Sequence, residues 1–269
     1  MTTGGRALVT GASRGIGRAV AIELSNRGFE VFAGVRRMED GAALQRDCPA
    51  LHPVLLDVTK LEDFEPPGGL RVLVNNAGAD DEHLPLEHDS IDAWRRIFDT
   101  NVFGLAALTQ AVIPELRRSG GGVIANITSV SLLAPVPFYA LYRSSKAAVS
   151  ALGESLRCEL APFGIRLLEV LPGPIDTDML AASGKEPQAT SFAAYRAAAE
   201  LGHAGRGAVE ELKTPAPEAA SRIVDAILDE RAPLKVGCDP LSEEMLKAWR
   251  AGTEEDYQRS YFPMFVPDF

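Results

Sequence analysis

Short apolar runs alternate with longer amphipathic stretches along most of the chain. The apolar runs have the length of β-strands and are apolar on both faces, which is typical of parallel strands covered by helices on both sides. Strands are predicted at 6–11, 30–37, 52–59, 71–78, 122–129, 165–173 and 234–239. We therefore expect an α/β protein with a doubly wound parallel sheet of about seven strands and helices on both of its faces.

The amphipathic stretches repeat apolar residues at helical spacing. In the first of them Ile16, Val20 and Leu24 share one face, and Gly28 marks its end. Helices are predicted at 14–28, 90–120 (bent around Pro114), 142–164 and 217–230. No linker rich in Gly, Ser or Pro divides the sequence, so residues 1–269 are predicted to form a single domain.

Two segments depart from this alternation. Residues 177–215 are weakly patterned and follow the carboxyl end of a strand, where ligands bind in parallel sheets. This segment is either a lid over a substrate or a variable surface excursion. The tail from about 240 to 269 ends in an aromatic stretch, 257–269, which would be a sticky patch if exposed. We expect it to dock on its own chain or on a neighbouring subunit.

Composition narrows the functional class. The net charge is −10, the pI is about 5.0 and no basic run occurs, which argues against nucleic-acid or anionic-membrane partners. Cys48, Cys158 and Cys238 are far apart, so neither a disulfide framework nor a metal site is expected. No signal peptide or membrane span is expected either, and the cytoplasm is the predicted location.

A glycine-rich loop, TGASRGIG (10–17), follows the first predicted strand. Gly11, Gly15 and Gly17 permit a tight turn and let the backbone approach a ligand closely. The helix that follows directs its free N–H groups and the positive end of its dipole at the same place. The loop therefore predicts a pyrophosphate site, with a spacing that differs from GxGxxG.

The stretch YRSSK (142–146) puts Tyr142 and Lys146 on one side of a predicted helix. Ordinary packing of the tyrosine and solvation of the lysine would explain the pair. A chemical explanation is that a nearby ammonium lowers the pKa of the phenol from about 10 toward the range useful for general acid–base catalysis. The spacing alone leaves both explanations open.

These two stretches belong to a longer series of motifs. The others are LLDVT (55–59), NNAG (75–78), TNVFG (100–104), ITSVS (127–131) and PGPIDT (172–177). Taken in order, the series resembles the short-chain dehydrogenases/reductases over about residues 5–180, and residues 154–179 are similar to the steroid and retinol branch. The resemblance implies a Rossmann-type fold and an NADP(H)- or NAD(H)-dependent oxidoreductase.

The resemblance also implies a role for each matching residue. Tyr142 would be the general acid–base, Lys146 would tune it and hold the cofactor ribose, Ser129 would steady the substrate oxygen, and Asn101 would support a water-linked proton relay. Thr128 and Ser131 are neighbours that resemble Ser129 in chemistry. The expected cofactor-binding residues are Gly11, Ser13, Arg14, Gly15, Ile16, Gly17, Arg36, Asp57, Val58, Asn76, Ala77, Gly78, Tyr142, Lys146, Pro172, Gly173, Ile175 and Thr177.

The end of the second predicted strand indicates which dinucleotide is used. An acid at this place commonly holds the ribose hydroxyls of NAD, but here Val35 is followed by Arg36 and Arg37. Arginine suits a 2′-phosphate, and by resemblance Arg36 and Arg14 are the two positions that mark NADP users. Arg37 is expected to be solvent-exposed. NADP(H) is therefore preferred to NAD(H), and the resemblance implies that Asp57 contacts the adenine.

A second tyrosine–cation pair, Tyr139 with Arg143, has the same spacing as Tyr142 with Lys146. An arginine suits a proton relay less well than a lysine, because it is effectively always charged. The position of Tyr142 relative to Ser129 also matches the family. Catalysis is therefore assigned to Tyr142, and Tyr139, with Ser129 and Tyr142, is expected to border the substrate.

The predicted activity is NADP(H)-dependent interconversion of a carbonyl compound and an alcohol. The apolar stretches at 132–141 and after Thr177 favour a hydrophobic substrate resembling a steroid, a retinoid or a lipid. A 3-oxoacyl thioester reductase is the first alternative, and a non-catalytic NADP-binding sensor is the second. The resemblance further implies a homodimer or homotetramer joined through the helices at about 90–120 and 142–164.

Overall fold

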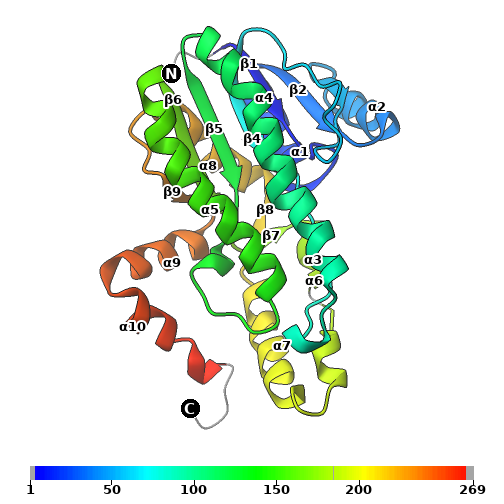
Figure 1. Cartoon of the computed structure of the whole chain (residues 1–269), viewed down its shortest axis with the longest axis vertical. Coiled ribbons are helices and arrows are strands. Elements are labelled where there is room, and N and C mark those ends of the chain that lie inside the picture. Colours follow the sequence, from blue (N-terminus) through cyan, green and yellow to red (C-terminus); the bar gives the residue numbers. More distant parts are fainter. Residues whose placement is uncertain (1–3, 184, 265–269) are drawn as a thin grey trace.

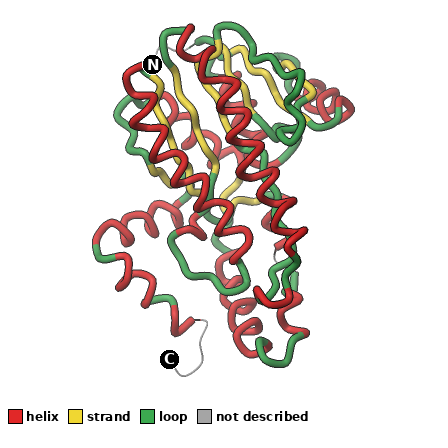
Figure 2. The backbone as a smooth tube through the Cα atoms, viewed as in Figure 1, coloured by secondary structure: helices red, strands yellow, loops and turns green. Residues whose placement is uncertain are grey.

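The strands form one parallel sheet in the order β3-β2-β1-β4-β5-β6-β9 (Figures 1 and 2). A computed structural model describes residues 4–183 and 185–264. The strands are β1 (Arg6–Val9), β2 (Glu30–Val35), β3 (His52–Leu55), β4 (Leu70–Asn75), β5 (Gly122–Ile127), β6 (Ile165–Leu171) and β9 (Lys235–Gly237). This arrangement confirms the predicted doubly wound sheet, whose strand order reverses direction between β1 and β4.

Two apolar cores cover the two faces of the sheet. On one face, α1 (Gly15–Asn26), α2 (Met38–Asp47) and α8 (Ala216–Leu228) bury residues such as Leu24, Leu44 and Ile223. On the other face, α4 (Leu105–Arg118) and α5 (Ala140–Leu160) lie side by side (Figure 1) and bury residues such as Leu116 and Leu160. The central strand β5 is buried along its whole length, which explains its continuous apolar run.

The helical stretch predicted at 90–120 contains an irregularity that the pattern did not show. Helix α3 (Ile91–Phe98) passes into a π-helical turn, Asp99–Gly104, before α4 begins. Pro114 lies inside α4, which continues to Arg118. By length and composition Ile91–Arg118 is apolar enough to cross a membrane, but its inner face packs on the sheet like that of a core helix. The π-turn is therefore the main departure from the expected helix.

The segment 177–215 leaves and rejoins the fold at one place. Short strands β7 (Ile175–Asp176) and β8 (Thr214–Pro215) pair in parallel, and Lys213 forms an ion pair of 3.1 Å with Asp176. Between them lie α6 (Asp178–Ser183), a 3₁₀ turn (Gln188–Ser191) and α7 (Arg196–Glu210). The weakly patterned segment is thus helical and is tied at its base.

The chain after β9 forms α9 (Pro240–Ala251), α10 (Glu254–Arg259) and a 3₁₀ turn, Phe262–Met264. Tyr257 packs against a small cluster that contains Leu171 and Leu246. The 3₁₀ turn contacts α7. The described part of the tail therefore docks on its own chain, and residues 265–269 lie outside the described residues.

Candidate active site

The glycine loop between β1 and α1 has the geometry that its sequence predicts. Gly11 and Gly15 have φ values of +63° and +57°, which side chains rarely adopt. Gly17 is fully buried in α1, where a Cβ would collide with the Asn76 amide and the Gly11 carbonyl. Ser13 lies in the turn and Ile16 in the first turn of α1, which carries no acidic residue. These features leave an exposed, electropositive helix N-terminus suited to phosphate.

Thr10 and Asn76 join the glycine loop to the end of β4. The Thr10 hydroxyl oxygen accepts hydrogen bonds from the backbone N–H groups of Asn76 and Ala77 at 2.9 and 2.8 Å. The Asn76 side chain donates to the carbonyl oxygen of Thr10 at 2.9 Å. The side chain of Asn76 therefore shapes the loop, and Thr10 is a positioning residue that the motif comparison missed.

Three arginines gather around the end of β2. Arg37 binds Asp40 through two hydrogen bonds of 2.9 and 2.8 Å, whereas Arg36 is exposed and forms no ion pair within residues 4–183 and 185–264. The Arg37 hydrogen bond is the largest influence on the pKa of Asp40, which is lowered, and the charges of Arg14 and Arg36 act in the same direction. Arg14 and Arg36 thus both lie within electrostatic range of Asp40, and Arg36 is available to an anion.

Asp57 follows the carboxyl end of β3, the strand that pairs with β2. Desolvation raises its pKa, but hydrogen bonds from Thr59 and the charges of Lys60 and Arg36 outweigh this effect, so the pKa is lowered. The carboxylate accepts from the Thr59 hydroxyl at 2.7 Å. Asp57 is thus a fixed anion near the expected adenine. Val58, beside it, is buried against Gly104 in the π-turn.

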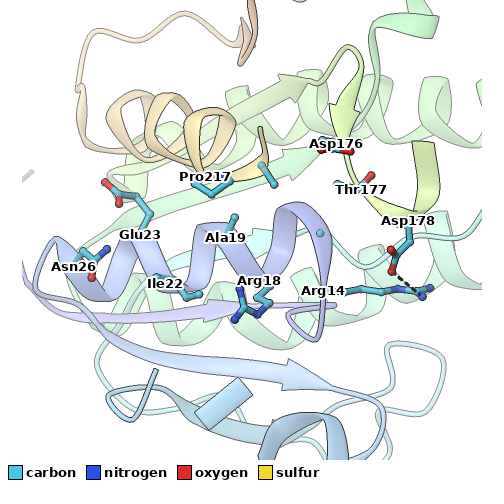
Figure 3. Close-up of a pocket in the computed structure, with 12 residues that line it drawn as sticks. Arg14, Arg18, Ala19, Ile22, Glu23, Asn26, Asp176, Thr177, Asp178 and Pro217 are labelled. Atoms are coloured by element: carbon cyan, nitrogen blue, oxygen red, sulfur yellow. Dashed lines mark ion pairs between the residues drawn. The ribbon is translucent and has the colours of Figure 1, made fainter. Parts of the chain in front are cut away.

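Figure 3 shows the start of α1 beside the base of the 177–215 segment. Arg14 extends toward Asp178 on α6, with 3.5 Å between the charged groups. Both side chains are more than 70% exposed, so the pair contributes little to stability. A cavity of about 340 Å³ opens along this side of α1 and includes Gly15 and Thr177. Arg14 therefore has a local partner that a phosphate would have to replace.

Tyr142, Lys146 and Ser129 come together as the resemblance implies. Tyr142 and Lys146 lie on α5, with the Lys146 ammonium 5.7 Å from the centre of the Tyr142 ring. Ser129 follows β5 and forms a hydrogen bond with the Tyr142 hydroxyl. The Lys146 ammonium also donates to the carbonyl oxygen of Ile127 at 2.9 Å. The strand end and the helix thus place a phenol, a hydroxyl and a cation at one point.

Burial governs the protonation of this group. Burial raises the pKa of Tyr142, the charge of Asp80 raises it further, and the hydrogen bond with Ser129 lowers it. Burial also lowers the pKa of Lys146 to about 8, while the charge of Asp80 opposes that change. The expected lowering of the phenol pKa by Lys146 is therefore not what this structure shows. The electrostatic effect of burial exceeds that of the neighbouring cation.

Asn101 lies in the π-turn, and its side chain forms hydrogen bonds with the backbone of the loop that follows β4. Its amide oxygen accepts from the Ala79 N–H at 2.8 Å, and its amide nitrogen donates to the Ala79 carbonyl and to Ser145 at 2.9 and 3.0 Å. A Cβ on Gly78 would lie 3.4 Å from the Lys146 ammonium and 3.5 Å from the Asn101 amide oxygen. Asn101 is thus close to Lys146 with its side chain engaged, and its part in a proton relay stays a prediction.

The PGPIDT turn closes the other side of the site. The buried Asp239 accepts from the Gly173 N–H at 2.7 Å and caps α9 through Ser242 at 2.9 Å. The carbonyl oxygen of Pro172 accepts from Val130 at 3.0 Å. Ile175 opens β7, and the Thr177 hydroxyl donates to its carbonyl at 3.2 Å. Asp239 is a support that sequence comparison could not find, because it lies 66 residues after Gly173.

Thr128 and Ser131 are distinguished from Ser129 by their contacts. Thr128 is buried and donates to Glu169 on β6 at 3.0 Å. The other oxygen of Glu169 accepts from Ser150 at 2.9 Å. Ser131 lies in the 3₁₀ turn, and its N–H donates to the Ser129 hydroxyl oxygen at 3.1 Å. Ser129 is therefore the hydroxyl that faces Tyr142, held from behind by a buried network around Glu169.

The 177–215 segment packs beside this site through aromatic rings. Phe192 stacks on His88 at 3.8 Å between ring centres, and Tyr195 meets the ring of Phe138 edge-on at 6.0 Å. Phe138 has a φ of +66°, a left-handed conformation unusual for a bulky residue. It immediately precedes Tyr139, the N-cap residue of α5. The segment thus lies against the start of α5, the helix that carries Tyr142 and Lys146.

Comparisons with known proteins identify the family to which this chain is similar. The family model described as "short chain dehydrogenase" matches residues 6–188. The 3beta-hydroxysteroid dehydrogenase 1 of Eggerthella lenta is 35% identical over 68% of this chain and 75% of its own length. Estradiol 17-beta-dehydrogenase 2 of Rattus norvegicus is 35% identical over 64% of this chain, which spans 49% of that protein.

A solved structure covers nearly the whole chain. The short-chain dehydrogenase of Burkholderia cenocepacia J2315 in complex with NADP has a TM-score of 0.76 and 29% identity over 98% of both chains. A short-chain dehydrogenase of Streptomyces avermitilis has a TM-score of 0.75 and 26% identity over 98% of this chain and 96% of that chain. The fold is thus shared from end to end, including the segment beyond residue 188.

Proposed function

Because the chain belongs to the short-chain dehydrogenase family, we propose that it is an NADP(H)-dependent oxidoreductase that interconverts a ketone or aldehyde and an alcohol. The family model and the curated relatives support the oxidoreductase class. The observation that carries the reaction type is the meeting of Tyr142, Ser129 and Lys146 at the carboxyl end of β5. A phenol, a hydroxyl and a cation in that arrangement suit proton transfer to a carbonyl oxygen.

NADP(H) fits the described residues. The glycine loop would hold the pyrophosphate at the N-terminus of α1, where Gly11 and Gly15 adopt left-handed conformations that side chains rarely allow. Arg36, exposed and without an ion pair in the described chain, would bind the 2′-phosphate, and Asp57 would lie beside the adenine. Structures similar to this chain, such as that of Burkholderia cenocepacia, contain NADP.

In the proposed reduction, the nicotinamide supplies a hydride to the carbonyl carbon when the cofactor is bound. Tyr142 donates its proton to the carbonyl oxygen, and its raised pKa keeps that proton on the phenol until it is needed. Ser129 donates a hydrogen bond that stabilises the developing negative charge. Lys146 supplies a positive charge next to the Tyr142 ring, which favours the phenolate that remains after transfer.

We propose the 177–215 segment as a lid over an apolar substrate. Its contacts with His88 and Phe138 close one side of the site, and the 3₁₀ turn of the tail braces α7 from outside. Two relatives named above are named for steroid substrates, which supports a steroid-like or lipid-like body. The lid is the part of the chain placed to select that body.

Titration with NADPH and NADH, followed by nicotinamide fluorescence, tests the proposal. Arg36→Ala should weaken NADPH binding about tenfold to a hundredfold and leave NADH binding unchanged, because only the 2′-phosphate loses its partner. Arg37→Ala is the matched control and should change neither, since Arg37 is paired with Asp40. Equal binding of NADPH and NADH by the unaltered protein would contradict the assignment of NADP(H) as the cofactor.

The Tyr142→Phe variant tests the reaction itself. It should keep NADPH binding and lose at least a hundredfold in ketone reduction, within the usual range for general acid catalysis.

A further inference from the structure

Tyr139 is a buried donor that the proposed reaction does not use. Its ring meets that of Tyr142 edge-on, with 6.4 Å between the ring centres. Its hydroxyl is buried and has no hydrogen-bond partner within residues 4–183 and 185–264. Buried polar groups in native proteins are nearly always paired, so a hydroxyl left alone next to the reacting centre indicates a partner that is not part of the chain.

The Tyr139 ring is held so that it cannot turn to find another partner. His83, from the loop after β4, stacks on it with 3.9 Å between ring centres. His83 is itself held by Asp80 at 3.0 Å. The left-handed conformation of Phe138 sets the direction from which the Tyr139 ring enters the site. The supported His83 ring and the Phe138 backbone thus both restrict the position of the Tyr139 hydroxyl.

The lid brings a positive charge to the same ring. The Arg206 guanidinium lies 5.4 Å from the centre of the Tyr139 ring. His203 precedes it by three residues on α7, so both side chains lie on one face of the helix. The Nδ1 atom of His203 is buried and lacks a hydrogen-bond partner in the described chain. This face of the lid therefore presents a cation over the Tyr139 ring, and the polar nitrogen of His203 lies one helical turn before it.

We propose that Tyr139, His203 and Arg206 form a subsite that binds a carboxylate on the substrate, at the end remote from the reacting carbonyl. Guanidinium groups and hydroxyl donors are the common partners of carboxylates in proteins, and the charge makes these hydrogen bonds the strong ones. The inference rests on the proposed function, because the carbonyl is located by Tyr142. The substrate class is thus an apolar oxo acid rather than a wholly apolar ketone.

Three carbonyl compounds of equal chain length test the subsite. They are a hexanoic acid with an oxo group on its penultimate carbon, its methyl ester, and the alkyl ketone without the acid group. The protein with NADPH should reduce the acid with a kcat/KM at least tenfold above that for the ester or the ketone, because only the acid finds the charged partner. Tyr139→Phe and Arg206→Gln should each remove that preference, mainly by raising KM for the acid, so that the ratio of kcat/KM for the acid to kcat/KM for the alkyl ketone falls to about one.

The control is Arg196→Gln on the same helix, where Arg196 donates to the Thr190 carbonyl instead. It should keep the preference for the acid. Equal kcat/KM values for the three compounds in the unaltered protein would overturn the subsite. So would an equal loss on all three in Tyr139→Phe, which would show only a structural role for Tyr139.

A binding measurement separates this inference from the proposed reaction. Unsubstituted hexanoate should bind the NADPH-loaded protein in calorimetry, and Arg206→Gln should weaken that binding at least tenfold. Binding of this kind would support the subsite even if none of the three carbonyl compounds were reduced, an outcome that would instead count against the reductase. Absence of hexanoate binding would overturn the subsite while leaving ketone reduction as evidence for the reductase.

Discussion

At the scale of single residues, burial disfavours the charged forms of both Tyr142 and Lys146. The pKa of Tyr142 is raised and that of Lys146 is lowered to about 8. Below about pH 8 the pair is therefore a neutral phenol beside an ammonium. That state can donate a proton to a carbonyl, whereas alcohol oxidation must begin from the phenolate. This protonation state suits the reduction proposed above.

The titration of Lys146 predicts a decrease in kcat/KM at alkaline pH, called the alkaline limb of the pH profile below. The kcat/KM for NADPH should fall as pH rises through about 8, because the ammonium that faces the cofactor site loses its proton there. Asp80→Asn should move this limb to lower pH, since the Asp80 charge holds the pKa of Lys146 up. The pH profile of kcat/KM for both proteins measures this.

Asp81→Asn is the neighbouring control for the alkaline limb. Asp81 pairs with Arg96 at 2.9 Å and does not contribute to either catalytic pKa. Its limb should coincide with that of the unaltered protein. A limb that stays in place in Asp80→Asn would show that another group titrates.

The sequence predicts which residues react but not their environment. The motifs mark Tyr142, Lys146 and Ser129, which the structure brings together, because their residue types and spacing are local features. The pKa of Tyr142 depends instead on how completely the fold buries it and on Asp80, which no motif marks. Glu169 was missed for a similar reason, because its partners Thr128 and Ser150 lie on other elements.

At the scale of elements, the close contact between α1 and the end of β4 is possible because Gly17 has no side chain. Gly17→Ala would drive a Cβ into the Asn76 amide and the Gly11 carbonyl. We expect a loss of about 1–3 kcal/mol in the free energy of unfolding, as in other overpacked cores, and weaker NADPH binding because the loop shifts. Urea unfolding and a NADPH titration measure the two effects.

Gly68→Ala is the matched control for Gly17→Ala. No atom lies within 4 Å of a Cβ placed on Gly68. Stability and NADPH binding should therefore stay within about 0.5 kcal/mol of the unaltered protein, as for an ordinary surface change. A Gly17→Ala protein as stable as Gly68→Ala would show that Asn76 can yield without moving the loop.

Elements with a two-sided apolar run or an amphipathic face were predictable, and others were not. Strands β1 to β6 have such runs, and α1, α4, α5 and α8 have such faces. In contrast, α7 is rich in Ala and Gly, and its large apolar residues Leu201 and Val209 are exposed. The π-turn at Asp99–Gly104 keeps the apolar spacing of its neighbours, so periodicity cannot distinguish it from α-helix.

At the scale of the whole molecule, Asp239 connects the C-terminal helices to the cofactor side of the sheet. Asp239→Ala removes the cap of α9 and leaves the Gly173 N–H without its partner. The two losses together predict a decrease of about 2–4 kcal/mol in the free energy of unfolding. Urea unfolding, with the slope checked for two-state behaviour, measures this.

Thr253→Ala provides the comparison for Asp239→Ala. Thr253 also caps a helix, but α10 is short and Thr253 is exposed. Its loss should cost about 1 kcal/mol or less. Equal costs for the two substitutions would mean that Asp239 acts only as a helix cap and does not tie the tail to the turn.

Assembly into a dimer or tetramer stays a prediction at this scale. Helices α4 and α5 lie next to each other on one face of the sheet, where the resemblance places the contact between subunits (Figure 1). Phe103, just before α4, is 62% exposed. An exposed large aromatic side chain on this face is compatible with a partner surface.

The short β7–β8 pairing at the base of the lid has a consequence for how such proteins diversify. The segment leaves the fold at Asp176 and returns at Thr214, on strands that are direct neighbours. Its two ends are therefore one strand spacing apart whatever lies between them, and longer or shorter segments close at little extra entropic cost. The whole segment, together with the carboxylate contacts proposed for it, can therefore be replaced by another without moving β5 and α5, which carry the proposed reacting residues.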